Sequence, residues 1–177
     1  MKKDTSLKSI IVLVSICLFI SVALAAVNML TSPKIEEATR IAEQEALSSV
    51  LPQNGGFEKI QLEEYPDGVT EIYRDLDGEG YVVMLSIKGY DSSKPMSAAV
   101  GFTSAGEITE LKIISAQGET SGIGSKVTLP SFTSLFSGKD KALDGVDAIS
   151  GATVSSSAVI EAVKESFAAF ESAKEVS

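Results

Sequence analysis

A stretch of small and hydroxyl-bearing residues near the C-terminus is the part of the sequence best suited to chemistry. Asp147–Thr153 ends in Ser-Gly-Ala-Thr, and the serines at 155–157 follow it. Gly151 and Ala152 have almost no side chain, so a bulky ligand can approach the backbone closely. The serines are candidate N-caps, because apolar residues behind them repeat at helical spacing: Ile160, Val163, Phe167 and Phe170. A helix N-terminus suits a phosphate. The same residues also fit a capped helix that follows a loop and binds nothing.

A second informative stretch is Gln117–Lys126, in which three glycines follow an expected strand. Such a backbone bends sharply and can lie against a planar ligand. It is not a nucleotide P-loop, because no Gly-Lys-Ser/Thr follows at the required place. Taken alone, it is equally consistent with a structural turn.

The composition excludes several kinds of site. The chain of 177 residues has no histidine and one cysteine, Cys17. It therefore lacks a histidine general base and histidine ligands for zinc or haem. By itself it holds neither an internal disulfide nor a cysteine-ligated iron–sulfur cluster. The net charge of −9 argues against nucleic acid as a partner. Any redox chemistry would need an organic cofactor.

The N-terminal part predicts a membrane anchor. Residues 9–33 carry no charge, and Ile, Val, Leu and Ala dominate residues 10–30. About twenty such residues cross a hydrocarbon core of about 30 Å. Because three lysines precede the run, we expect residues 1–8 in the cytoplasm, a transmembrane helix over 9–30 and the remaining chain outside the cell membrane. Ala23-Leu24-Ala25 also fits a cleavable signal peptide, but the apolar run is longer than a signal needs.

The residues after the anchor predict a stalk helix over 31–52 and a globular domain over 53–177. Ser32 is a candidate cap for the stalk, and Pro33 suits its first turn. Helical periodicity gives way to alternating strand patterns after Asn54-Gly55-Gly56. We expect an α+β fold with a mostly antiparallel sheet and flanking helices. Its strands are expected around 57–62, 69–73, 81–88, 98–102 and 108–116.

One polar segment resembles the start of a calcium loop. Asp75, Asp77 and Glu79 occupy the first, third and fifth places, with Gly80 at the sixth. The twelfth place is Ser86 where a bidentate glutamate is required, and a strand begins where a helix should follow. We therefore expect a hairpin turn.

Residues 147–153, Asp-Ala-Ile-Ser-Gly-Ala-Thr, resemble the flavin-attachment motif of the FMN-binding domains in the RnfG and NqrC families. The match covers Asp147, Ser150, Gly151 and Ala152, and it implies that Thr153 carries FMN through a phosphoester made by a flavin transferase. The serines at 155–157 are rival acceptors.

Two further segments strengthen the resemblance. Residues 119–124 are similar to the Glu-Thr-x-Gly-x-Gly element of these families, which implies that Glu119, Thr120, Gly122, Ile123 and Gly124 help form the flavin pocket. The families commonly have Pro at the place of Ser121 and Leu at that of Ile123. Lys126 either approaches the flavin or lies on a solvated face. Residues 26–35 are similar to the end of the RnfG membrane helix, and the short chain favours RnfG over NqrC.

The resemblance implies an FMN-carrying subunit of a membrane-bound ferredoxin:NAD oxidoreductase complex that couples electron transfer to Na⁺ or H⁺ translocation. Its partners would be other membrane and iron–sulfur subunits, and it would have no complete activity, catalytic side chain or metal of its own. Two alternatives remain at this point: an extracytoplasmic FMN carrier or regulator of another membrane reductase, and an anchored binding module without redox function.

Overall fold

The computed structural model describes residues 3–51, 56–78 and 80–176. The chain divides into two compact units, Met1–Ile41 and Ala42–Ser177. Five residues that contribute to the sequence-based expectations lie outside the described ranges: Lys2, Pro52, Asn54, Gly55 and Glu79.

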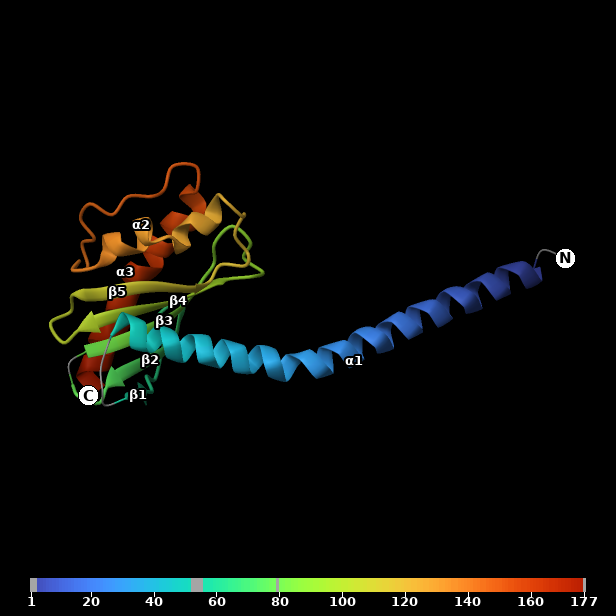
Figure 1. Cartoon of the computed structure of the whole chain (residues 1–177), viewed down its shortest axis with the longest axis horizontal. Coiled ribbons are helices and arrows are strands. Elements are labelled where there is room, and N and C mark those ends of the chain that lie inside the picture. The colour runs from blue at the N-terminus through green and yellow to red at the C-terminus, as the bar shows by residue number, and fades with distance from the viewer. Residues whose placement is uncertain (1–2, 52–55, 79, 177) are drawn as a thin grey trace. The chain divides into compact units, whose positions relative to one another are not determined.

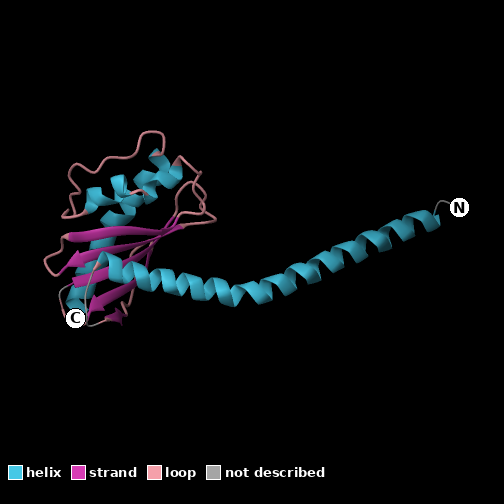
Figure 2. Ribbon diagram, in the orientation of Figure 1, coloured by secondary structure: helices cyan, strands magenta, loops and turns pink. Residues whose placement is uncertain are grey.

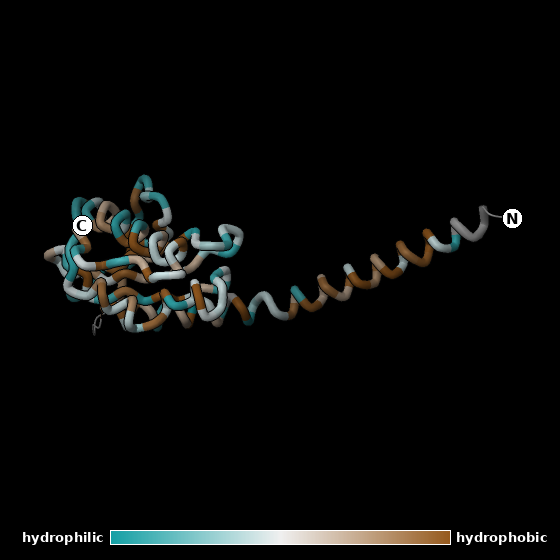
Figure 3. Tube along the Cα trace, turned by 90° about the horizontal axis from the view of Figure 1, so that it is seen from above, coloured by the Kyte–Doolittle hydropathy of each residue, from teal (hydrophilic) through white to brown (hydrophobic). Residues whose placement is uncertain are grey.

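Helix α1 runs without interruption from Lys3 to Val50, with Pro33 inside it (Figure 1). The helix start expected at Ser32 is therefore wrong. The Thr31 hydroxyl donates to the backbone oxygen of Val27 at 2.9 Å, a bond within the helix, and proline removes only one N–H from the helical pattern. The apolar part of α1 is exposed, and the helix is long and apolar enough to span a membrane (Figure 3).

The last turns of α1 belong to the second unit. Here the helix covers one face of the sheet through a small apolar cluster: Ala46, Leu47, Val50, Leu51, Val82, Met84 and Ala99. The Thr109 hydroxyl donates to the backbone oxygen of Val50, and so satisfies a carbonyl at the C-terminal end of the helix. The expected stalk thus ends as a part of the globular unit.

Five antiparallel strands form one sheet in the order β1-β2-β3-β4-β5 (Figure 2). Their bounds are Phe57–Ile60, Val69–Asp75, Gly80–Ile87, Met96–Thr103 and Ile108–Ser115. Seven of the eight residues of the central strand β3 are buried, because α1 covers one face and the C-terminal helix α3 covers the other. These strands agree closely with those expected from the sequence, and the α+β fold class is confirmed. Strands β2 and β3 pair antiparallel, so the hairpin expected between them is confirmed.

Helix α3, Thr153–Val176, packs its apolar face on the sheet. Its Phe167 and Phe170 contact Phe102 of β4, with ring centroids 4.9 and 5.2 Å apart. Between β5 and α3 the chain forms short helices: η1 (Gly124–Thr128), α2 (Pro130–Thr133) and η2 (Ser134–Phe136). The core therefore fixes the direction of α3 and leaves its first turn beside the loop that follows β5.

Candidate functional site

The two chemically suggestive stretches of the sequence meet at one cavity of about 510 Å³. We call it the α3-start cavity. The stretch 117–126 after β5, which we call the glycine loop, supplies one wall. The first turn of α3 supplies another wall, and the loop between β3 and β4 adds Tyr90. Its lining residues are Tyr90, Thr120, Ile123, Gly124, Gly151, Ala152, Thr153, Val154 and Ser155.

Most of the residues expected to hold a cofactor line this cavity. Six of the nine are in its wall: Thr120, Ile123, Gly124, Gly151, Ala152 and Thr153. Glu119 is buried behind the wall, with 8% of its surface exposed. Ser150 and Gly122 belong to the same two loops and lie outside the lining. Lys126 also lies outside the lining.

Thr153 is the first residue of α3 and its side chain is exposed. The three serines that follow differ from it. Ser155 is 3% exposed, and its hydroxyl donates to the Glu119 carboxyl. Ser156 is fully buried and donates to the backbone oxygen of Ala152 at 2.9 Å. Ser157 is exposed but lies outside the cavity lining. Of these four hydroxyls, Thr153 alone is both exposed and in the cavity wall.

The serines are not N-caps, contrary to the expectation from their spacing. The helix begins at Thr153, so 155–157 lie within its first turns. The backbone bends before it at Gly151, which has a φ of +81°, a conformation that glycine adopts without strain. The Ser156 hydroxyl accepts from the Ile149 amide at 2.9 Å, which holds this bend against the helix. The first N–H groups of α3, which begins at Thr153, have no carbonyl partner within the helix.

Hydrogen bonds within the glycine loop fix its conformation. The amides of Ile123 and Ser125 both donate to the Thr120 carbonyl, at 3.1 and 3.2 Å. Gly122 has a φ of +73°, and its amide donates to the Ser125 hydroxyl at 2.9 Å. This turn leaves Ile123 49% exposed in the cavity wall.

The sequence did not identify Tyr90 as a site residue, because it follows the strand expected at 81–88 and has the appearance of an ordinary loop residue. It is 71% exposed and lines the cavity. The next residue, Asp91, accepts from the Ser93 hydroxyl at 2.6 Å and the Ser93 amide at 3.0 Å, and these bonds hold the pKa of the Asp91 carboxyl below its usual value. With Ile123 and Val154, Tyr90 gives the cavity three exposed apolar side chains. Exposed apolar groups in a concave wall indicate a ligand with an apolar face.

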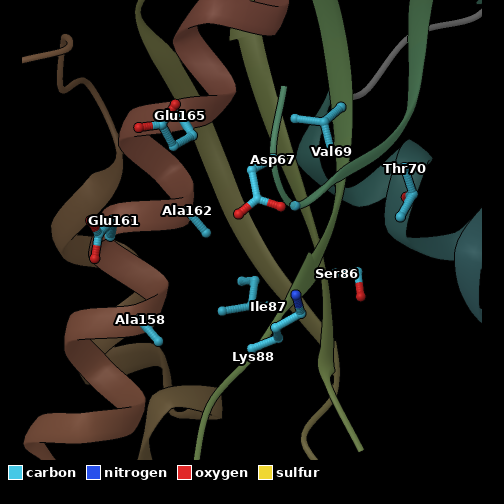
Figure 4. A pocket seen from close by; sticks show the side chains of 11 residues that line it. Asp67, Val69, Thr70, Ser86, Ile87, Lys88, Ala158, Glu161, Ala162 and Glu165 are labelled. Carbon is cyan, nitrogen blue, oxygen red and sulfur yellow. The ribbon is translucent and has the colours of Figure 1, made fainter. Parts of the chain in front are cut away.

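A second cavity, of about 600 Å³, lies farther along α3, between that helix, β2 and β3 (Figure 4). We call it the acidic groove. Asp67, Glu161 and Glu165 border it together with Lys88. Figure 4 shows the Asp67 side chain in the space between α3 and the strands. Three carboxylates make this groove unsuited to a phosphate. In the ranges the structure describes, no group of three His, Cys, Asp or Glu side chains is arranged to hold a metal ion.

Residues 89–168 match the model of the FMN-binding domain family. This range includes every residue that lines the α3-start cavity. It begins at Gly89, directly before Tyr90, so it also covers the wall that the sequence motifs did not indicate.

The chain is also similar to known proteins over most of its length. It is 30% identical over 173 residues to the G subunit of the ion-translocating oxidoreductase complex of Methanosarcina acetivorans, covering 88% of this chain and 89% of that protein. It is 29% identical over 184 residues to the G subunit of the proton-translocating ferredoxin:NAD(+) oxidoreductase complex of Clostridium ljungdahlii, covering 93% and 94%. The crystal structure of Shewanella oneidensis NqrC has a TM-score of 0.46 at 27% identity, over 55% of this chain and 54% of that one. The chain therefore belongs to the family formed by the G subunits of ion-translocating oxidoreductase complexes.

Proposed function

We propose that this chain is the FMN-carrying subunit of a membrane-bound ferredoxin:NAD oxidoreductase complex that couples electron transfer to the translocation of Na⁺ or H⁺. Its family membership and its FMN-binding domain support this function. The observation that carries it is the α3-start cavity, where two distant motifs meet and the Thr153 hydroxyl is exposed at the start of α3. When bound, FMN supplies the redox centre, and the protein supplies attachment and surroundings.

The residues of the cavity fit the two ends of FMN. An exposed threonine hydroxyl at a helix start suits the phosphate, because the free N–H groups and the dipole of α3 favour negative charge there. The exposed side chains of Tyr90, Ile123 and Val154 suit the planar apolar ring. Among the described residues, the cavity wall contains no charged side chain that would repel the phosphate.

The attachment is a phosphoester between the FMN phosphate and Thr153, made by a flavin transferase. Thr153 is favoured over the serines because Ser155 and Ser156 are buried and already hydrogen-bonded, and Ser157 is outside the cavity. A covalent bond would also retain the cofactor on the outer side of the membrane, where a dissociated FMN is lost.

The chain crosses the cell membrane once, with its N-terminus in the cytoplasm and the FMN domain outside. The apolar segment of α1 and the lysines before it support this topology. The other partners in the assembled complex are membrane and iron–sulfur subunits, between which this chain passes electrons.

Mass spectrometry of the full-length chain, co-expressed with a flavin transferase, tests the attachment. The native chain should carry one FMN adduct and fluoresce on a denaturing gel. Thr153→Ala should carry none and keep its fold, and Ser157→Ala should be labelled as the native chain is. Flavin retained on Thr153→Ala would assign the bond to another hydroxyl. A native chain without any adduct, in the presence of an active transferase, would contradict the proposal.

A further inference from the structure

Glu119 joins two walls of the α3-start cavity from behind. Its Oε1 accepts from the Tyr90 amide at 2.9 Å, and its Oε2 accepts from the Ser155 hydroxyl. Both partners line the cavity, whereas Glu119 itself does not. One carboxyl group thus connects the loop after β3 with the first turn of α3, two segments that are 65 residues apart between Tyr90 and Ser155.

The burial of this carboxyl group is unusual. Glu119 is 8% exposed, and no lysine or arginine forms an ion pair with it among the described residues. A buried carboxyl group is unfavourable unless hydrogen bonds replace its water, and here those bonds come from the two cavity walls. Leucine or methionine would fill the same space without this penalty. A glutamate at this position therefore indicates a role for its hydrogen bonds to Tyr90 and Ser155.

Two glycines make room for the carboxyl group. A Cβ atom at Gly89 would lie 1.9 Å from Glu119 Oε1. A Cβ atom at Gly124 would lie 2.6 Å from Glu119 Oε2 and 2.7 Å from Ser155 Oγ. Neither glycine has the positive φ that would by itself require glycine. The Glu119 side chain approaches both glycines closely; Met96 Cε also lies 2.9 Å from a Cβ at Gly89, and Ser155 Oγ is the further neighbour at Gly124.

We propose that Glu119 is a positioning residue: it fixes the Tyr90 wall relative to the first turn of α3, so that the cavity has its shape before the flavin is attached. This role rests on the proposed function of the cavity. It differs from the direct contact with the flavin that the sequence motif implied. Glu119 acts through Tyr90 and Ser155, and the flavin transferase receives a chain in which Thr153 and the ring-binding wall are already in place.

Substitutions at Glu119 separate hydrogen bonding from space filling. Gln keeps an oxygen for the Tyr90 amide, and its NH₂ can donate to Ser155, whose hydroxyl then accepts. Met fills a similar volume and offers neither bond. Ala removes both. Glu110→Ala, at an exposed position on β5, is the control.

Hydrogen–deuterium exchange of the full chain without flavin, in detergent, tests positioning apart from activity. We expect protection of the Tyr90, Ala152 and Ser156 amides, which are hydrogen-bonded in the native chain, to fall about tenfold or more in Glu119→Met and Glu119→Ala. Glu119→Gln and Glu110→Ala should stay within about twofold of the native chain. The yield of flavin attachment at a fixed transferase concentration should follow the same order.

Ser155→Ala keeps the test decisive if the Glu119 variants do not fold. It removes only one of the two bonds, so protection should fall in α3 and remain at Tyr90. Native-like exchange and attachment in Glu119→Met would overturn the positioning role, because space filling would then suffice. That result would leave the proposed function intact. A native chain that accepts no flavin would instead contradict the proposed function, and the exchange experiment would still report on Glu119.

Discussion

The two cavities beside α3 share a helix but differ in the charge of their walls. The α3-start cavity takes residues 151–155 from the helix and its approach, and within the described part of the chain no charged side chain lines it. The acidic groove takes Ala158, Glu161, Ala162 and Glu165 from the next turns, together with Asp67. The groove is the larger, about 600 Å³ against about 510 Å³. Volume alone would therefore favour the groove over the α3-start cavity that we propose for the flavin.

Position along the helix explains the difference. The favourable effect of a helix start on an anion is confined to about the first turn, so it acts on Thr153 and is weak at Glu161. Like charges about 4 Å apart near a protein surface repel by about 4 kcal/mol, which opposes a phosphate beside the groove carboxylates. The start of the helix thus favours a phosphate, and the region two turns later disfavours one.

The largest expected effect comes from giving the α3-start cavity the charge of the groove. Val154 is 60% exposed in the cavity wall, so Val154→Asp places a carboxylate beside Thr153. We expect flavin attachment to fall about tenfold or more, because the carboxylate repels the phosphate. The free energy of unfolding should not fall, since a carboxylate in the first turn of a helix stabilises that helix by about 0.3–1 kcal/mol. Flavin fluorescence per chain and urea unfolding measure the two effects.

Val154→Asn is the matched control, because it has nearly the same shape as Asp and is uncharged. Equal attachment in the Asp and Asn variants would show that charge does not distinguish the two cavities, and the comparison would fail.

Sequence patterns were sufficient for the elements whose signals are local. The nearly continuous apolar run at 81–87 and the helical spacing of Val163, Phe167 and Phe170 predicted β3 and α3, because a strand covered on both faces and a helix packed on a sheet impose those patterns. The glycine loop and the Ser-Gly-Ala-Thr stretch were likewise found from residue types, and the structure brings them together.

Long-range contacts explain what the sequence could not predict. Ser155 looked like a cap, but its hydroxyl bonds Glu119, which is 36 residues away in the chain. Tyr90 enters the cavity wall because β3 ends beside the first turn of α3, and only the packing of α3 on the sheet decides that. Ser32 and Pro33 have the residue types of a helix start, yet α1 continues through them.

A smaller effect should follow from removing the aromatic wall. In the Thr153→Ala background, where FMN can bind only reversibly, Tyr90→Ala should weaken FMN affinity by about two- to tenfold, since an aromatic contact contributes about 0.5–1.5 kcal/mol. Tyr90→Phe keeps the ring and should bind as the Thr153→Ala parent does. Titration of added FMN, followed by its fluorescence, gives the affinities. An unchanged affinity in Tyr90→Ala would remove Tyr90 from the ring-binding wall.

A glycine pair separates backbone strain from cavity shape. Gly151 and Gly138 have φ values of +81° and +71°, and a Cβ at either would meet nothing within 4 Å. Gly→Ala at each should therefore destabilise the chain by a similar amount, about 1 kcal/mol. Gly151→Ala should also reduce flavin attachment, because Gly151 lines the α3-start cavity and Gly138 does not. Thermal unfolding and fluorescence per chain measure these effects, and equal attachment in both variants would place Gly151 outside the path of the flavin.

The smallest expected effect is at the acidic groove itself. Glu161→Gln with Glu165→Gln removes two of its carboxylates and keeps the side-chain volumes. Both residues are exposed, and neither forms an ion pair within the described ranges, so stability should change by no more than about 0.5 kcal/mol. Flavin attachment should equal that of the native chain. If neutralising the groove raised attachment severalfold, its carboxylates would be acting on the phosphate at a distance, and the two cavities could not be treated as electrostatically separate.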